Sequence, residues 1–257
     1  MLRTVIYQSK EGISYIQLNR PEQFNALNRE MLDALLHALQ ETEQNTDRIM
    51  ILTGGGKAFC AGGDIKMMKD FAEKKEFETV MSLIEEIVLT LYRMPKLTIA
   101  AIHGSAVGLG LSLALACDYV IANKEAQMGM LFIGIGLAPD GGGHFFLEQR
   151  IGLNAAKQFI WSGNTVSAAE ARNIQLIDNI TEGEVLSAGQ KIAGKLQHSP
   201  LIAMLQTKAL YHHQNMDKLK NILVAEKENQ WYLRNTSDHA EGVQAFLQKR
   251  KPVFNGE

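Results

Sequence analysis

The fold is decided by the stretch LTIAAIHGSAVGLGLSLALACDYVIA, residues 97–122. Its apolar run at 97–102 predicts a buried strand, and the glycine-containing segment 103–110 predicts a turn after it. Residues 111–117 then predict a short apolar helix, and residues 118–122 predict a second strand. Strand, glycine turn, helix and strand in this order indicate an α/β protein.

The chain before this stretch shows the same alternation. Residues 4–8 and 13–18 alternate like the two strands of a hairpin, and residues 48–53 predict another buried strand. Asn28 is placed to cap a helix, and a charged helix is expected at about 73–93. The helix after Asn28 carries an apolar stripe formed by Met31, Leu32, Leu35, Leu36 and Leu39.

The last hundred residues change in character. Amphipathic segments predict helices there, at 167–178, 189–197, 201–213 and 219–233. We therefore expect a core at 1–195 and a helical region at 196–257, with a soft boundary near residue 195.

The composition is that of an ordinary soluble globular protein. Of the 257 residues 46% are hydrophobic and 21% are charged, and the net charge of −2 indicates no surface for nucleic acid. The longest apolar run, at 106–117, is too short to cross a membrane, and the N-terminus lacks the apolar segment of a signal peptide. Cys60 and Cys117 do not have the spacing of zinc ligands, so we expect no metal. A cytoplasmic enzyme is the default expectation.

Two glycine-rich stretches, at 54–65 and 103–118, precede predicted helices. Glycines let a ligand approach the backbone, and the first N–H groups of a helix have no partner within it. Two such N–H groups that converge would hold a developing oxyanion. Lys57 is followed by Ala58, unlike a phosphate-binding loop, and Leu113 replaces the third glycine of a dinucleotide fingerprint. Tight packing of the turns is the alternative interpretation.

Six motifs follow one another along nearly the whole chain: NRPEQFNALN, GKAFCAGGDIKMM, AAIHGSAVGLGLSLALACDYVIA, GIGLAPDGGG, SGNTVSAAEARNIQLID and EGVQAFLQKRKPVF. Their order and spacing resemble the crotonase superfamily, the enoyl-CoA hydratase/isomerase family. The resemblance implies an α/β spiral of repeated β-β-α turns, with C-terminal helices that assemble it into a homotrimer or a dimer of trimers. It also implies acyl-CoA thioester substrates and an enolate held in an oxyanion hole, with no cofactor besides the coenzyme A of the substrate.

The resemblance assigns roles within the two glycine stretches. It places the oxyanion donors at the backbone N–H groups of Ala61 and Leu109. The matching positions give candidate substrate-binding residues, namely Ala26, Lys57, Ala61, Gly63, Asp64, Ile65, Gly108, Leu109, Ser112, Phe132 and Leu137. Asp64 is alternatively a helix cap. The basic run at 248–251 either reaches the phosphates of coenzyme A or is a solvated charge run.

The sequence departs from the family pattern at the catalytic acids. Hydratases of this family use two glutamates, and Ser112 and Phe132 stand at those positions. Hydration needs a positioned water, a base and a proton donor, so ordinary hydratase activity is not expected. Asp140 stands where the resemblance places the acid of double-bond isomerases, including those of the phenylacetate-pathway type. A double-bond shift needs one carboxylate, and apolar neighbours such as Phe132 and Leu137 would raise its pKa.

Each of these residues also has a plainer interpretation. Asp140 lies between Pro139 and glycines, which is typical of a turn or of a helix cap. Ser112 either packs or faces the acyl chain. His144 is a second candidate proton carrier or an ordinary helix histidine, and His103 is expected to pack beside the glycine turn. The methionines at 67, 68, 128 and 130 line an acyl pocket or fill the core.

Three functions therefore stay open. The first is an acyl-CoA double-bond isomerase with Asp140 as base and acid. The second is a hydratase, or another crotonase reaction, on an unusual substrate. The third is a protein that binds CoA esters without catalysis.

Overall fold

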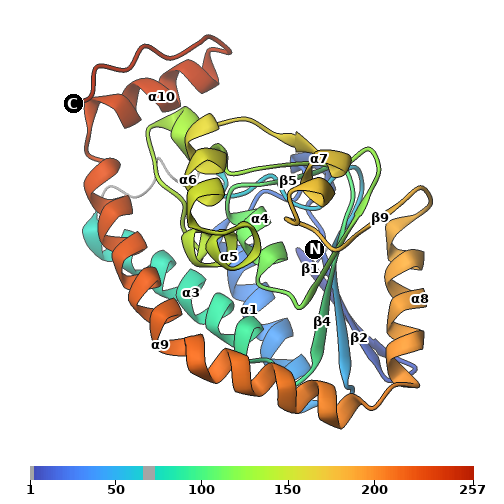
Figure 1. Cartoon of the computed structure of the whole chain (residues 1–257). Helices are drawn as coiled ribbons and strands as arrows, with labels where there is room; N and C mark the ends of the chain where they lie inside the picture. Colours follow the sequence, from blue (N-terminus) through green and yellow to red (C-terminus); the bar gives the residue numbers. More distant parts are fainter. Residues whose placement is uncertain (1–2, 66–72) are drawn as a thin grey trace.

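The computed structural model describes residues 3–65 and 73–257, and its core is a six-stranded sheet (Figure 1). The strands lie in the order β1-β2-β3-β4-β6-β9, with bounds β1 Val5–Lys10, β2 Ile13–Leu18, β3 Ile49–Gly54, β4 Leu97–Ile102, β6 Tyr119–Asn123 and β9 Asn179–Thr181. The predicted hairpin is β1 and β2, which pair antiparallel, and all other neighbours pair in parallel. The α/β class predicted from the sequence is confirmed.

Helices cover both faces of this sheet. Helices α1 (Arg29–Gln44) and α3 (Lys74–Arg93) lie on one face, and α8 (Val185–Gln197) lies on the other (Figure 1). Strand β3 is a continuous apolar run because both of its faces are buried. Met50 and Leu52 pack in the core on one side of the sheet, and Ile49 and Ile51 pack in the second core beneath α8. The predicted cap of α1 is confirmed, because Asn28 Oδ1 accepts from Met31 N at 3.0 Å.

A second, smaller sheet continues directly from the first. Strand β5 (Ser105–Val107) pairs in parallel with β7 (Gln127–Gly129), and β7 pairs antiparallel with β8 (Val166–Ser167). The segment 103–110, expected as a turn, therefore contains a short strand. Helix α4 (Leu109–Leu115) begins immediately beyond it. The second sheet thus fixes the point at which α4 starts.

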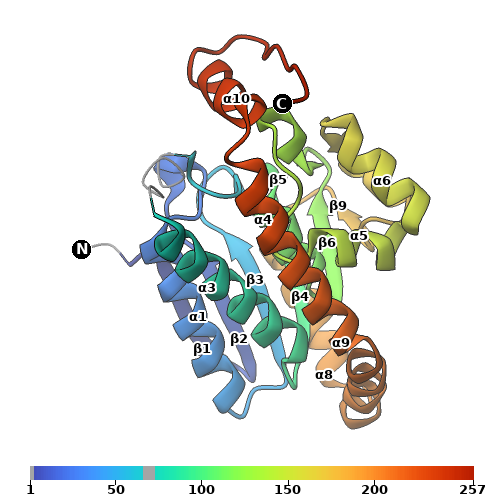
Figure 2. The ribbon, with the colours of Figure 1, turned by 90° about the vertical axis from the view of Figure 1, so that its left-hand side faces the viewer.

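The C-terminal part of the chain wraps around this core. Helix α9 (Leu201–Leu233) is one continuous helix of 33 residues, where the sequence predicted two, and it runs across the front of the molecule in Figure 2. No glycine or proline interrupts residues 201–233, so nothing breaks the helix between the two apolar segments. The helix expected at 167–178 is shorter, since α7 spans Ala168–Asn173, and residue 195 lies inside α8. No helix within the described ranges is both long and apolar enough to cross a membrane.

Candidate active site

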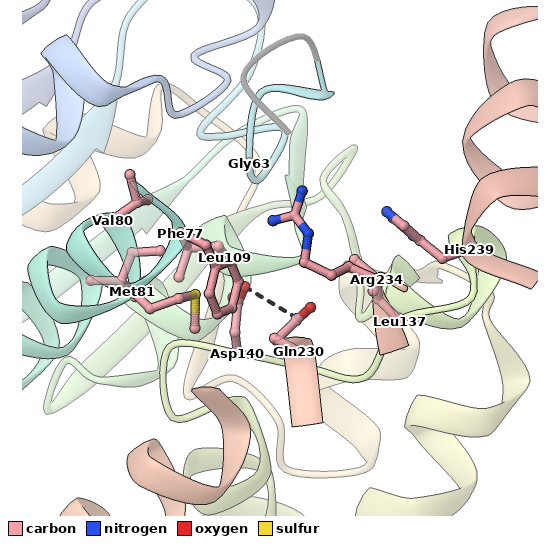
Figure 3. Close-up of a pocket in the computed structure, with 11 residues that line it drawn as sticks. Gly63, Phe77, Val80, Met81, Leu109, Leu137, Asp140, Gln230, Arg234 and His239 are labelled. Carbon is pink, nitrogen blue, oxygen red and sulfur yellow. Dashed lines mark hydrogen bonds between the residues drawn. The ribbon is translucent and has the colours of Figure 1, made fainter. Parts of the chain in front are cut away.

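Asp140 lies in a cavity of about 40 Å³ between the core and the C-terminal helices (Figure 3). It stands between the short helix η2 (Leu131–Ile135) and helix α5 (Gly143–Ile151), and only 7% of its surface is exposed. Leu137 and side chains of α3 supply the apolar wall, and α9, its C-cap and α10 (Ser237–Leu247) supply the polar one. The apolar set from α3 is Phe77, Val80, Met81 and Ile84, and the polar set is Gln230, Arg234 and His239.

The Asp140 carboxylate is not used by the turn that carries it. The turn is closed through the backbone carbonyl of Asp140, which accepts from Gly143 N at 3.1 Å and from Ser112 Oγ at 2.8 Å. The N-cap of α5 is Gly142, and no side chain of its own turn caps the helix, so the cap interpretation of Asp140 is wrong. Oδ2 accepts a long 3.3 Å hydrogen bond from Gln230 Nε2, while Oδ1 is buried and has no partner. A buried polar atom left unpaired is costly in a fold and is typical of a functional group.

Glu226 of α9 caps the N-terminus of α5 in place of a local side chain. Its carboxylate is 2% exposed; Oε2 accepts from Gly142 N at 2.7 Å, and Oε1 accepts from His144 N at 3.1 Å. His144 Nδ1 lies 2.8 Å from the same Oε1. Burial, and then the negative charge of Glu226, raise the pKa of Asp140 from 3.8 to about 8. Asp140 is therefore a carboxyl group that can release and recover a proton near neutral pH.

Two backbone N–H groups next to Asp140 have no hydrogen-bond partner among the described residues. One belongs to Leu109, the first residue of α4, which follows Gly108 with its positive φ of 55°. The other belongs to Gly63. The predicted donor Ala61 is wrong, because its N–H already donates to Phe24 O at 2.9 Å. Gly62, with φ 84°, brings the two loops together: a Cβ there would lie 2.9 Å from Val107 O and 3.6 Å from Leu109 N.

Gly63 and Leu109 also line a second, larger cavity of about 400 Å³. Of the predicted substrate-binding positions, this cavity brings together Ala61, Gly63, Ile65, Gly108, Leu109 and Phe132. Phe132 therefore belongs to the larger cavity and does not line the one that holds Asp140, whereas Leu137 does. The two residues with unpaired N–H groups therefore line both cavities.

The family model described as enoyl-CoA hydratase/isomerase matches residues 8–257. This chain belongs to the enoyl-CoA hydratase/isomerase family. YhaR of Bacillus subtilis (strain 168), which carries the same family name, is 46% identical over 97% of this chain and 98% of its own length. The 1,2-epoxyphenylacetyl-CoA isomerase of Escherichia coli (strain K12) is 32% identical over 100% of both chains.

Solved structures of the enoyl-CoA hydratase/isomerase family share the fold. A crystal structure of an enoyl-CoA hydratase from Mycobacterium avium subsp. paratuberculosis K-10 aligns with a TM-score of 0.89, at 26% identity and with 98% of each chain covered. The expected crotonase fold, with its C-terminal helical region, is therefore confirmed.

Other positions that the family pattern assigned lie outside both cavities. The carbonyl of Ala26 accepts from Arg20, whose Nη1 also forms a 3.1 Å ion pair with Asp64 Oδ2. Lys57 is exposed on the surface, and the hydroxyl of Ser112 is directed to the Asp140 carbonyl. The helix that Asp64 would cap, and Met67 and Met68, fall outside the described residues. Met128 and Met130 are core side chains.

The histidines singled out in the sequence have local partners. His144 is bonded to Glu226, and His103 Nε2 lies 3.1 Å from Gly56 O, so neither lines the cavity of Asp140. In the run 248–251, Arg250 forms an ion pair with Glu241 of α10. The packing interpretation of the glycine stretches also holds, because a Cβ at Gly110 would lie 2.6 Å from Cys60 Cβ.

Sequence reasoning missed the polar side chains of the C-terminal helices. Glu226, Gln230 and Arg234 recur every fourth residue and therefore share one face of α9. The available signal in the sequence was the helical spacing of Leu219, Leu223, Glu226 and Gln230, which places two polar residues in line with an apolar stripe. In the structure all four side chains are buried. A buried carboxylate on an amphipathic helix indicates a specific partner, which the sequence alone does not identify.

Proposed function

We propose that this member of the family moves a double bond within an enoyl-CoA thioester, with Asp140 as the single acid and base. The observation that carries the proposal is the buried, unpaired Oδ1 of Asp140 in a cavity that Gly63 and Leu109 also line with unpaired N–H groups. A base and two free backbone donors in one cavity are the equipment that enolate chemistry needs.

The reaction is a proton transfer in two halves. The Asp140 carboxylate removes a proton from C2 of a 3-enoyl-CoA, and the electron pair of the C–H bond moves through the conjugated system to the thioester oxygen. The N–H groups of Gly63 and Leu109 hold the resulting dienolate oxyanion. Asp140, now protonated, returns the proton to C4, and the product is the 2-enoyl-CoA. Because the thioester itself accepts the electron pair, the proposed reaction requires no cofactor.

The lining of the cavity supports isomerisation over hydration. Asp140 is the only carboxylate among the described residues that line it, and Phe132 and Ser112 supply no second acid. The pKa of Asp140 is raised to about 8, close to neutral pH, which suits a group that must act first as a base and then as an acid. The Escherichia coli relative is named as an isomerase of an epoxide, 1,2-epoxyphenylacetyl-CoA, and so supports isomerisation of a CoA thioester in general terms.

The proposed assembly is a homotrimer or a dimer of trimers around the C-terminal helices. The apolar side chains that α9 leaves exposed support this proposal, namely Ile202, Leu210, Tyr211 and Val224. Light scattering on the purified protein would give the number of subunits directly.

The deciding experiment offers the enzyme a 3-enoyl-CoA and, separately, a 2-enoyl-CoA, and follows absorbance and mass. We expect double-bond migration at constant mass, abolished in Asp140→Asn. Addition of water to the 2-enoyl-CoA that survives in Asp140→Asn would instead indicate a hydratase with another base. Tight binding of both thioesters without any change would indicate a CoA-ester binding protein.

A further inference from the structure

His239 is one of the polar groups in the wall of the cavity that holds Asp140. It lies in the first turn of α10 and is 8% exposed. Its Nδ1 lies 2.8 Å from the carbonyl oxygen of Ile135. A carbonyl oxygen only accepts hydrogen bonds, so this contact assigns the proton to Nδ1 and leaves Nε2 of the neutral ring as an acceptor.

Nε2 of His239 has no hydrogen-bond partner within residues 3–65 and 73–257. Figure 3 shows the side chain directed across the cavity towards the guanidinium end of Arg234. Burial and the nearby positive charge of Arg234 both lower the pKa of His239, so the ring stays neutral at pH 7. The cavity wall therefore presents an acceptor that is open to a ligand carrying a hydrogen-bond donor.

The ring is held rigidly in this orientation. Gly136 has φ 67°, and a Cβ there would lie 2.8 Å from His239 N. A Cβ at Gly242 of the same helix would lie 2.6 Å from Ile135 Cα. The close contact of α10 with η2 therefore fixes both the Nδ1 hydrogen bond and the direction of Nε2. A pre-positioned acceptor of this kind loses little entropy when it binds a donor.

We propose that His239 Nε2 accepts a hydrogen bond from a hydroxyl group at the end of a short acyl chain, so that the enzyme prefers hydroxylated acyl-CoA thioesters. The inference rests on the proposed function only in placing the acyl group in this cavity. A volume of about 40 Å³ holds roughly three water-sized groups, which favours a short chain. A lone pair at Nε2 attracts a hydroxyl proton and repels a carboxylate, which has no proton to donate.

Binding of saturated thioesters tests the proposal without turnover. Calorimetry compares 4-hydroxybutyryl-CoA with butyryl-CoA, and 5-hydroxypentanoyl-CoA with pentanoyl-CoA. We expect at least one hydroxylated member to bind at least tenfold more tightly than its partner. In His239→Asn the side-chain amide can still donate to Ile135 O but Nε2 is gone, so the preference should disappear while butyryl-CoA affinity is kept. His213→Asn, at an exposed histidine of α9, is the matched control and should keep the preference.

Three results would overturn the proposal. They are equal affinities within both pairs in the wild-type protein, a hydroxyl preference that persists in His239→Asn, and succinyl-CoA binding more tightly than every hydroxylated probe. The wild-type comparison decides even if the variant does not fold. Double-bond migration is measured in a separate experiment with enoyl-CoA substrates. A failure there would leave these binding results unaffected, because none of the binding probes contains a double bond.

Discussion

The carboxylate of Glu226 lies 2.7 Å from the backbone nitrogen of Gly142 and so joins the long C-terminal helix to the turn that carries Asp140. The contact spans 84 residues of sequence. It caps helix α5 with a charge from another helix, and the same charge acts on Asp140 through a buried environment. Glu226 is thus at once a structural cap and a determinant of the pKa of the proposed acid.

Asp140→Asn should abolish the double-bond shift and leave binding intact. An amide cannot carry the proton, and a positioned acid or base typically contributes a factor of about 10²–10⁴. The measurement is kcat/KM for a 3-enoyl-CoA, with calorimetric binding of a saturated acyl-CoA as the control. A variant with wild-type turnover would show that another group moves the proton.

The rate should rise with pH and level off above about pH 8. The pKa of Asp140 is raised to about 8, so the carboxylate that abstracts the proton is the minor form at pH 7. The profile of kcat/KM against pH reports the ionisation of the free enzyme. A profile that is already flat from pH 5 would mean that the working base has an ordinary carboxyl pKa.

The stability of the protein should fall between about pH 4 and pH 8 because of the same residue. The unfolded chain releases the proton of Asp140 near 3.8, whereas the folded chain keeps it until about 8. Within this window the folded state binds more protons, so a rise in pH favours unfolding, by up to about 1.4 kcal/mol per pH unit. Asp140→Asn removes this pH-dependent loss of stability. The melting temperature of the variant should therefore exceed that of the wild type by more at pH 8 than at pH 5. A constant difference across this range would contradict the expectation.

Glu226→Gln should shift the pH–rate profile to lower pH. Loss of the negative charge removes one cause of the raised pKa of Asp140. The amide still offers one oxygen to the N–H groups of α5, so a cost of about 1–3 kcal/mol in unfolding free energy is expected. Glu228→Gln, two residues away and exposed, is the control and should leave the profile unchanged. An unshifted profile in a folded Glu226→Gln would show that burial alone sets the pKa.

Leu109→Pro tests the oxyanion donor directly, because proline lacks the N–H. Leu109 is the first residue of α4, a position where proline is well tolerated, and the preceding Gly108 adapts to it. Loss of one such donor typically lowers kcat by a factor of about 10²–10³. Leu109→Ala, which keeps the N–H but shortens the side chain, separates the two effects. Equal activity of the two variants would exclude this N–H from the reaction.

The sequence predicted the fold wherever local signals and tertiary contacts agree. Asn28 caps α1 as expected, and the apolar run at 97–102 is the buried strand β4. The two predicted helices at 201–213 and 219–233 are one helix, because a polar stretch between apolar segments does not end a helix without glycine or proline. Helix ends of this kind are set by what the helix packs against, which the local sequence does not contain.

The sequence predicted site residues only where they belong to a motif of the family. The motif around Asp140 identified the acid, but the motif around Ala61 led to the wrong N–H group, since the choice between Ala61 and Gly63 depends on a hydrogen bond to Phe24. Glu226 and Gln230 reach Asp140 and its turn from 80 or more residues away. Distant pairings of this kind are tertiary facts that no local pattern reveals.

The origin of the cavity walls has a consequence for the making of the enzyme. Both sheets, the two loops with the unpaired N–H groups and Asp140 are all encoded before residue 182, while Glu226, Gln230, Arg234 and His239 come from the last 32 residues. A growing chain can therefore build its scaffold and the apolar wall long before the polar side chains around its acid exist. A chain cut short before α9 would keep Asp140 and the apolar side chains of α3 beside it, but it would lack the polar side chains of α9 and α10.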